Sequence, residues 1–547
     1  MHGLMQDVPL LVSMLIRHAD RHHGDVEIVS RRVEGDLHRT TWREIHTRAR
    51  KLAKALGAQG VAISDRVATI AWNGHRHLEL YYAVSGMGAV IHTINPRLPP
   101  DQIAWIANHA EDKLLFFDMT FLPIVEKIAA QCPTVEAFVA MTDRSRMPAS
   151  TAIANLLCYE DLLAAQDDRY DWPALDERLA SSMCYTSGTT GHPKGVLYSH
   201  RSTVLHSFAA CVPDGPQLSA REVILPVVPM FHVNAWGIPY AGAMAGAKIV
   251  FPGPGLDGKS LHDLMEGERV TMSAGVPTVW QGLLAYVEQN NLSFSTMRRT
   301  VIGGAALPPA MLRTFEEKYD VHALHAWGMT EISPIGTVCA LRPKHEGLPR
   351  EETYKVKAKQ GRAVFGVDMK IVDPMGRELP WDGVAFGDLL VRGPWIVNGY
   401  YRGEGGNPLV TDEDGNAWFP TGDVATIDPD GYMQITDRSK DVIKSGGEWI
   451  SSIDIENVAV SHPAVAMAAC IGIAHPKWGE RPLLVVVKKP GHEVTREQLL
   501  AHYDGRVARW QVPDDVAFVE SIPIGATGKM LKTKLREQFR AHRLPGT

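Results

Sequence analysis

Short apolar runs alternate with amphipathic segments along the first part of the chain. Runs of strand length lie at residues 66–71, 89–94 and 113–118, whereas segments with helical spacing lie at about 41–57 and 79–88. The first helical segment begins with Thr-x-x-Glu, which is typical of a helix amino terminus. Strands that alternate with helices favour an α/β sheet with mostly parallel strands.

The same alternation continues through the middle of the chain, where glycine-rich turns follow the apolar runs. We expect strands at 248–251 and 300–302, and an apolar segment at 223–230 that leads into residues 231–236. The turn at 303–308 reads Gly-Gly-Ala-Ala-Leu-Pro. Ligands of open α/β sheets bind at the carboxyl ends of the strands, so these turns predict the position of a binding site.

The pattern changes after about residue 360. Short apolar runs at 368–372, 387–391 and 431–435 alternate with Gly, Asp and Pro turns, which predicts a small antiparallel β subdomain. Residues 437–441 then form a charged link without apolar periodicity. A compact α/β unit follows, with predicted helices near 454–460, from Thr495 and over 531–543, and predicted strands at 467–473, 483–488 and 516–519.

We therefore predict an α/β protein of two domains. A chain of 547 residues is too long for one hydrophobic core. We place a large N-terminal domain of α/β sheets, with the small β subdomain, at residues 1–437. A smaller, mobile α/β C-terminal domain spans 438–547, and the hinge between the two lies near Lys440.

Composition narrows the classes of function. A net charge of -6 argues against nucleic acid as the main partner. The six cysteines form no pattern typical of a metal site or a redox pair, which favours a reduced, cytoplasmic setting. The apolar run at 9–16 is too short to span a bilayer and lacks the flanks of a signal peptide, so we expect no transmembrane segment.

Residues 185–196 read Tyr-Thr-Ser-Gly-Thr-Thr-Gly-His-Pro-Lys-Gly-Val and combine glycines, hydroxyls and one lysine. Glycines let a backbone approach a bulky anion, while hydroxyls, backbone N–H groups and a lysine supply hydrogen bonds and charge. The stretch predicts a loop that binds a polyphosphate. It is not a Walker loop, because two residues separate Gly191 from Lys194 and a glycine follows the lysine.

This loop resembles the phosphate loop of the adenylate-forming superfamily, which includes acyl-CoA synthetases, luciferases and peptide-synthetase adenylation domains. Further matches run from about residue 40 to residue 532, and the chain is most similar to fatty-acyl-CoA synthetases and methylthiopropanoate-CoA ligases. The resemblance implies that ATP and a carboxylic acid form an acyl-AMP, which then reacts with coenzyme A. The phosphate-binding residues that it implies are Thr186, Ser187, Gly188, Thr189, Thr190, Gly191 and Lys194.

The resemblance also implies a nucleoside pocket. Gly304, Ala305 and Ala306 match the turn that forms the adenine wall, and Trp327 stands where many relatives carry an aromatic residue that stacks on the purine. Gly328, Met329 and Thr330 lead to Glu331, whose carboxylate is a suitable Mg²⁺ ligand. Asp423 and Arg438 match the ribose contacts, although this chain has Asp437 where relatives usually have glycine before the arginine.

Two lysines of the C-terminal part match mobile loops of the superfamily. Lys444 lies in the loop that approaches the pantetheine of CoA in relatives. Lys529 lies in Pro-Ile-Gly-Ala-Thr-Gly-Lys-Met, which resembles the tail motif whose lysine enters the active site. The resemblance therefore assigns catalytic roles to Lys529, Glu331 and Thr186.

The acyl-binding residues are predicted to be His232, Val233, Trp236 and Gly303. Amino-acid-activating relatives carry an aspartate near this segment, but residues 231–236 contain none, so we expect an uncharged acyl tail. Trp236 matches a tryptophan that gates the acyl tunnel of fatty-acyl-CoA synthetases, and a plain core role is the alternative. Medium- or long-chain fatty acids are the first candidates, followed by methylthiopropanoate and aryl acids.

Two other functions remain open from the sequence. A peptide-synthetase loading module would normally be followed by a carrier segment, for which no room remains after Thr547. A nucleotide-binding regulator without catalysis should have lost Lys529 or Glu331, and both are present. Because relatives are often homodimers, we expect a homodimer here.

Overall fold

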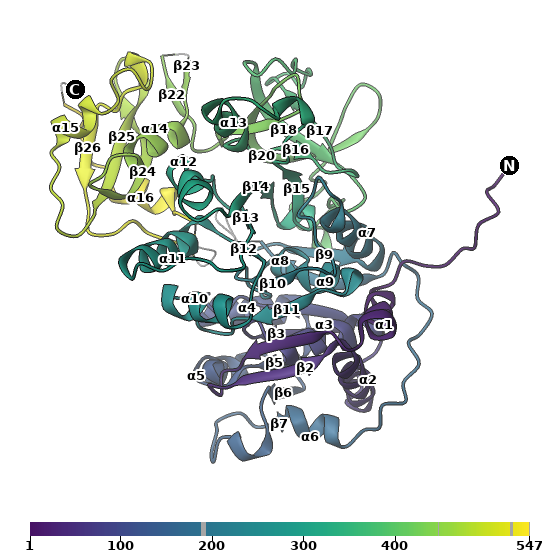
Figure 1. Cartoon of the computed structure of the whole chain (residues 1–547). Helices are drawn as coiled ribbons and strands as arrows, with labels where there is room; N and C mark the ends of the chain where they lie inside the picture. Colours follow the sequence, from purple (N-terminus) through teal and green to yellow (C-terminus); the bar gives the residue numbers. More distant parts are fainter. Residues whose placement is uncertain (187–192, 447, 526–528, 546–547) are drawn as a thin grey trace.

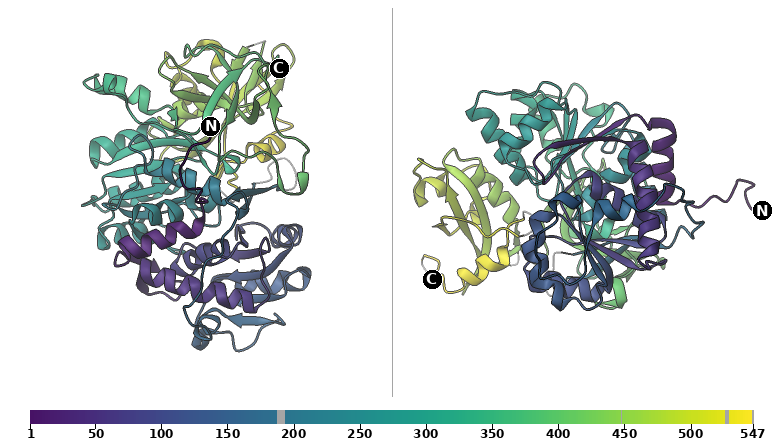
Figure 2. Two further views of the ribbon diagram at one scale, coloured as in Figure 1. Left: turned by 90° about the vertical axis from the view of Figure 1, so that its right-hand side faces the viewer. Right: turned by 90° about the horizontal axis from the view of Figure 1, so that it is seen from below.

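The computed structural model describes residues 1–186, 193–446, 448–525 and 529–545. These residues form four sheets with helices packed around them. Figure 1 shows two large α/β layers in purple to teal, a β-rich part in green, and a C-terminal unit in yellow. The views in Figure 2 show the C-terminal unit beside the larger body.

The first sheet has seven strands in the order β7-β6-β5-β3-β4-β8-β9. Its strands are parallel except for β9, which runs antiparallel to β8. The predicted phosphate loop lies between these two strands in the sequence, and its residues 187–192 are outside the described residues. The strands are β3 (Arg66–Ile70), β4 (Val90–Thr93), β5 (Asp112–Phe117), β6 (Ala137–Ala140), β7 (Leu156–Cys158), β8 (Ala180–Tyr185) and β9 (Gly195–Ser199). The helices that follow along the chain are α3 (His75–Gly86), α4 (Pro100–Ala110), α5 (Leu122–Ile128) and α6 (Tyr159–Ala164).

The second sheet has nine strands in the order β16-β15-β14-β13-β12-β10-β11-β1-β2. Its centre is parallel, and its two edges are antiparallel. The strands are β1 (Glu27–Arg31), β2 (Leu37–Thr41), β10 (Val223–Pro226), β11 (Lys248–Phe251), β12 (Met272–Gly275), β13 (Arg299–Ile302), β14 (His322–Gly328), β15 (Ile335–Val338) and β16 (Arg362–Ala363). The helices are α1 (Val12–His23), α2 (Trp42–Ala58), α7 (His200–Cys211), α8 (Val233–Trp236), α9 (Ile238–Ala245), α10 (Gly258–Gly267), α11 (Pro277–Gln289), α12 (Pro309–Arg313) and α13 (Arg350–Lys357).

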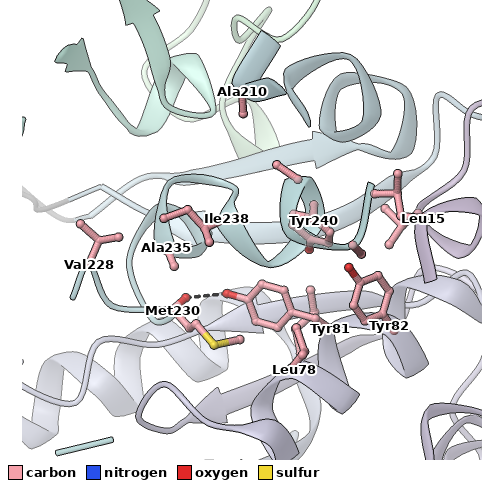
Figure 3. Packing of buried hydrophobic residues seen from close by; sticks show 14 of the residues in the cluster. Leu15, Leu78, Tyr81, Tyr82, Ala210, Val228, Met230, Ala235, Ile238 and Tyr240 are labelled. Atoms are coloured by element: carbon pink, nitrogen blue, oxygen red, sulfur yellow. Dashed lines mark hydrogen bonds between the residues drawn. The ribbon is translucent and has the colours of Figure 1, made fainter. Parts of the chain in front are cut away.

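The two α/β layers share one hydrophobic core, which Figure 3 shows from close by. Tyr81 and Tyr82 of α3 point from one layer toward Tyr240 of α9 in the other. Their hydroxyl groups donate hydrogen bonds to backbone carbonyls of the facing layer, at Met230 and Pro239. The buried hydroxyl groups of Tyr81 and Tyr82 are therefore paired, as burial requires.

The remaining two sheets lie in the last third of the chain. An antiparallel sheet contains β17 (Asp368–Val372), β18 (Phe386–Arg392), β19 (Val410–Thr411), β20 (Ala417–Ile427) and β21 (Met433–Arg438). The C-terminal unit contains β22 (Ile443–Ser445), β23 (Glu448–Ile450), β24 (Val465–His475), β25 (Gly479–Lys488) and β26 (Asp515–Phe518). Its helices are α14 (Ser452–Val460), α15 (Arg496–Ala501) and α16 (Lys532–Gln538).

The predicted α/β class is confirmed, and most predicted strands agree with observed ones to within a few residues. The helix expected at 79–88 instead spans His75–Gly86. All twelve of its residues are buried, so no polar face marks its start. The tail helix expected at 531–543 ends at Gln538. Asp437, which we expected in a charged link, is a buried residue of β21.

No helix within the described residues combines the length and the apolar character that crossing a bilayer requires. The division into domains at residues 437 and 438 stays a prediction.

Candidate active site

A cavity of about 260 Å³ lies between the carboxyl ends of β12, β13 and β14 and the segment that precedes α16. Its lining combines apolar side chains, chiefly from the second sheet, with charged or hydroxyl-bearing ones. The apolar residues include Ala210, Leu218, Met272, Ala274, Val301 and Val338. The polar residues include Thr186, Lys194, Glu331, Tyr400, Arg438 and Lys529. The cavity is suited to a ligand with both a charged and an apolar part.

Lys529 belongs to the C-terminal unit, but its side chain lines this cavity. The residue as a whole is exposed. The protein atoms packed around its ammonium group nevertheless desolvate it, and together with the neighbouring Arg438 they lower the pKa of Lys529 to about 8. The carboxylates of Asp423 and Glu331 partly oppose this shift. Lys529 is thus positively charged below about pH 8 and loses its charge as the pH rises through that value.

Glu331 follows β14 in a single turn of 3₁₀ helix, Thr330–Ile332. Burial raises the pKa of its carboxyl group, although a hydrogen bond from Tyr400 acts in the opposite direction. The Tyr400 hydroxyl oxygen lies 3.0 Å from Glu331 Oε1. Two backbone carbonyls of the turn also accept hydrogen bonds, that of Thr330 from the Tyr198 hydroxyl and that of Glu331 from the Val397 N–H. The turn is therefore held from two directions.

Tyr400 also connects Glu331 to the phosphate loop. The Lys194 ammonium lies 4.6 Å from the centre of the Tyr400 ring, in the geometry of a cation–π contact. Thr186 and Lys194 close the base of the loop, because the Thr186 N–H donates to the Lys194 carbonyl and the Lys194 N–H donates to Thr186 Oγ1. Tyr400 was not among the predicted site residues, because no local motif marks it.

Trp327, Asp423 and Arg438 form one polar cluster beside the cavity. The Trp327 indole Nε1 donates to Asp423 Oδ2 at 2.9 Å, and Arg438 Nε lies 3.0 Å from Asp423 Oδ1. Asp423 and Arg438 face each other across strands β20 and β21. The unusual Asp437 leaves this pairing intact, and its carboxylate accepts the backbone N–H groups of Arg438 and Ser452.

Residues Val233, Asn234, Ala235 and Trp236 form a left-handed turn, with φ values of 46°, 51°, 50° and 56°. This conformation costs roughly 1–2 kcal/mol per non-glycine residue. The Trp236 indole lies against the glycine turn after β13, since a Cβ atom added to Gly303 would come within 3.2 Å of the ring. The glycines at 303 and 304 thus make room for the indole.

His232 immediately precedes this turn and also lines the cavity. Burial, and then the charge of Lys529, lower the pKa of His232 to about 4. The imidazole is therefore neutral at physiological pH and can take part in hydrogen bonds without adding charge beside the apolar lining.

Most of the predicted site residues lie around this one cavity. Its lining includes Gly303, Gly304, Trp327, Gly328, Met329 and Thr330, with Thr186, Lys194, His232, Val233 and Trp236. Ala305 and Ala306 follow the glycine turn but are not among the lining residues. Lys444 is exposed on β22, where its ammonium lies 5.8 Å from the Trp449 ring centre and away from the cavity. Residues 187–191 of the predicted phosphate loop lie outside the described residues.

Two protein-family models match this chain. Residues 15–401 match the AMP-binding enzyme family, and residues 454–529 match the AMP-binding enzyme C-terminal domain. The first match alone covers more than half of the sequence. The chain therefore belongs to the AMP-binding enzyme family, and the resemblance to adenylate-forming enzymes is confirmed.

Individual relatives match over nearly the full length. The chain is 55% identical over 540 residues, 99% of each sequence, to the 3-methylmercaptopropionyl-CoA ligase of Ruegeria lacuscaerulensis. It is 52% identical over 539 residues, 98% of each, to the medium-chain-fatty-acid–CoA ligase of Ectopseudomonas oleovorans. In structure it resembles an anthranilate CoA ligase in complex with anthranoyl-AMP, with a TM-score of 0.84 and 24% identity over 98% of this chain and 99% of that one. This structural likeness supports the fold.

Proposed function

We propose that this protein is an ATP-dependent acid–CoA ligase that forms an acyl-AMP and then an acyl-CoA, releasing pyrophosphate and AMP. One observation supports this most strongly: a single cavity combines Lys529, Arg438 and Glu331 with a continuous set of apolar side chains. Such a lining suits a triphosphate beside an acyl chain. Full-length relatives that are named as CoA ligases support the same activity.

The chemistry requires charge stabilisation at the α-phosphate. A carboxylate oxygen of the acid attacks the α-phosphorus, the bond to the β-phosphate oxygen breaks, and pyrophosphate leaves. The ammonium group of Lys529 stabilises the negative charge that develops on the α-phosphate oxygens. Thr186 and Lys194 hold the β- and γ-phosphates, and Asp423 with Arg438 binds the ribose. In the second half-reaction the CoA thiol attacks the acyl carbonyl, loses its proton, and AMP leaves.

Glu331 fits a Mg²⁺ site in which phosphate oxygens of the substrate and water supply the other ligands. The described residues form no group of three or more metal-binding side chains. Mg²⁺ commonly binds through one or two carboxylates together with phosphate oxygens and water, and the Glu331 carboxylate lines the cavity. The ion would neutralise phosphate charge, while Tyr400 holds the carboxylate in place.

We infer that the substrate is a carboxylic acid with an uncharged tail. Among the described residues, Glu331 is the acidic group that lines the cavity, and we assign it to the nucleotide side. Medium- or long-chain fatty acids are the first candidates, and 3-methylthiopropanoate is the alternative favoured by the similarity to its ligase. We further expect a cytoplasmic homodimer in which the C-terminal domain moves about Lys440.

The apolar lining predicts how activity depends on chain length. Each methylene that enters the cavity should contribute up to about 0.8 kcal/mol, so kcat/KM should rise about three- to fourfold per carbon until the space is full. Trp236→Ala should lengthen the longest accepted chain, because the indole occupies the space beside Gly303 and Gly304. Pyrophosphate release with acids from propanoate to palmitate, with and without CoA, measures both effects.

Amino acids and dicarboxylates should be nearly inert in the same assay, because a charged tail group would lose its hydration without a partner. A flat profile, or a preference for an amino acid, would contradict the proposed substrate class. Pyrophosphate release that never yields a CoA thioester would favour a loading module. Nucleotide binding without pyrophosphate release would favour a regulator.

A further inference from the structure

The left-handed turn at residues 233–236 continues into Gly237, whose φ is 77°. Five consecutive residues therefore have positive φ, and only the last is a glycine. Valine, alanine and tryptophan do not favour this region, whereas asparagine occupies it more readily. The conformation must be imposed by contacts with the rest of the protein.

The side chain of Asn234 makes those contacts. It is 6% exposed, and its amide faces the first sheet and α3. Its Oδ1 accepts from the Cys184 thiol at 3.3 Å and its Nδ2 donates to Ser182 Oγ at 3.0 Å. The Tyr81 hydroxyl oxygen also lies 3.3 Å from Oδ1, while its hydrogen is donated to the Met230 carbonyl at 2.6 Å. Within the described chain, Asn234 is the one side chain of this turn with such polar partners.

Other contacts fix the chain on both sides of the turn. Asn73 accepts the Met230 N–H and donates to the carbonyls of Pro226 and Val228. On the far side, the Tyr82 hydroxyl donates to the Pro239 carbonyl. Figure 3 shows Tyr81 and Tyr82 approaching this segment from below, with Ala235 and Ile238 above them. Between these two points the segment is held by the Asn234 side chain and by the Ala235 N–H, which donates to the Pro229 carbonyl.

Gly237 explains why the turn cannot shift toward α7. A Cβ atom at this glycine would lie 2.6 Å from the His206 ring. The His206 Nε2 accepts the Ile335 N–H, so the ring is itself held in place. Close packing on one side and the Asn234 amide on the other thus hold the turn from two sides.

We propose that Asn234 is a specificity-determining positioning residue, whose buried amide fixes the left-handed turn and thereby sets the shape of the acyl-binding space. His232, Val233 and Trp236 line the cavity, while Asn234 points away from it into the core. The residue thus acts on the substrate through its neighbours in sequence. This inference rests on the proposed function, because it takes the apolar part of the cavity as the acyl site.

The test compares Asn234→Ala with Asn234→Gly and with Ser182→Ala. Asn234→Ala loses the amide contacts and disfavours positive φ, whereas Asn234→Gly loses the same contacts but permits positive φ. Ser182→Ala keeps the asparagine and removes only the hydroxyl that accepts from its Nδ2. Acyl-sulfamoyl-adenosines with tails of three to ten carbons serve as probes, and their dissociation constants are measured by calorimetry. Ser85→Ala is the matched control, because it removes a buried hydroxyl bonded to the Ser181 carbonyl outside the turn.

We expect the unmodified protein and Ser85→Ala to bind about three- to fourfold more tightly per added carbon. In Asn234→Ala the increase in probe affinity should fall below about twofold per added carbon. The dissociation constant for ATP should stay within about twofold of that of the unmodified protein. Asn234→Gly and Ser182→Ala should show intermediate gains. Ser182→Ala keeps the asparagine, so it tests the proposal even if the alanine variant fails to fold.

An unchanged gain per carbon in folded Asn234→Ala or Ser182→Ala would overturn the positioning role. Equal weakening of every probe and of ATP would also overturn it, because that pattern indicates a general loss of structure. Failure of the proposed function looks different: the unmodified protein itself would then show no dependence on chain length.

Discussion

Replacement of Lys529 by alanine should reduce the rate of acyl-AMP formation by roughly 10²–10³, the usual cost of removing a preorganised contact to a transition state. The Lys529 side chain lines the same cavity as Arg438 and Glu331. No other lysine of the described C-terminal unit lines that cavity. The variant should still convert supplied acyl-AMP to acyl-CoA, because we expect the C-terminal domain to move about Lys440 and to carry Lys529 out of the cavity before the thiol attacks.

The same residue predicts a pH dependence. The pKa of Lys529 is lowered to about 8 by desolvation and by Arg438. The protonated form is the active one, so kcat/KM for adenylation, which reports the free enzyme, should decline as the pH rises through about 8. Lys529→Arg keeps the positive charge and should move this decline to higher pH.

Rapid quenching and separation of acyl-AMP, with each half-reaction measured alone, provide the measurement. Lys534→Ala is a suitable control, since Lys534 is an exposed lysine of α16. If both half-reactions fell equally in Lys529→Ala, the lysine would have a structural role and not the one assigned here.

Replacement of Lys440 by proline should slow thioester formation and spare acyl-AMP formation, which is the reverse of the effect expected for Lys529→Ala. Lys440 is exposed and follows β21, where the chain leaves the antiparallel sheet for the C-terminal unit. Proline restricts φ and also the preceding residue, and large dihedral changes of moving domains concentrate at a few such positions. The variant should form acyl-AMP normally, while its rate of thioester formation falls by at least about 10², the cost of a misplaced reacting group.

The structure already has Lys529 in the cavity and Lys444 outside it. Under the roles proposed for these two lysines, this is the arrangement expected for adenylation. The backbone N–H groups of Asp441 and Val442 donate to the Arg438 carbonyl, so a proline at 440 leaves these bonds available. Lys440→Ala removes the same side chain without restricting φ and should retain both half-reactions. Normal CoA thioester turnover in the proline variant would place the hinge elsewhere.

Local patterns explain which features the sequence could predict. The strands at 248–251 and 368–372 agree with the structure at both ends, because each is an apolar run bounded by turn residues. The glycines at 303 and 304 and the Thr330–Glu331 pair were found because their chemistry is contained in a few adjacent residues. The glycines were predicted to follow a strand, and both pairs line the cavity.

Features that depend on distant segments were not predictable in this way. Tyr400 bonds Glu331 from a loop 69 residues away, and nothing in its neighbourhood distinguishes it from Tyr401. The apolar lining comes from separate elements whose patterns are those of ordinary core. The left-handed turn was missed because Val233 and Trp236 disfavour positive φ, and only the packing around Asn234 and Gly237 reveals it.

The most direct test of the proposed reaction follows the oxygen atoms. A carboxylic acid labelled with ¹⁸O in both carboxylate oxygens is incubated with ATP, Mg²⁺, CoA and the protein, and the nucleotide products are examined by mass spectrometry. Attack of the carboxylate on the α-phosphorus, followed by thiol attack on the carbonyl, transfers one labelled oxygen to AMP. We predict AMP with one ¹⁸O atom, unlabelled pyrophosphate and one equivalent of acyl-CoA. Formation of ADP with the label in inorganic phosphate would contradict the adenylate route.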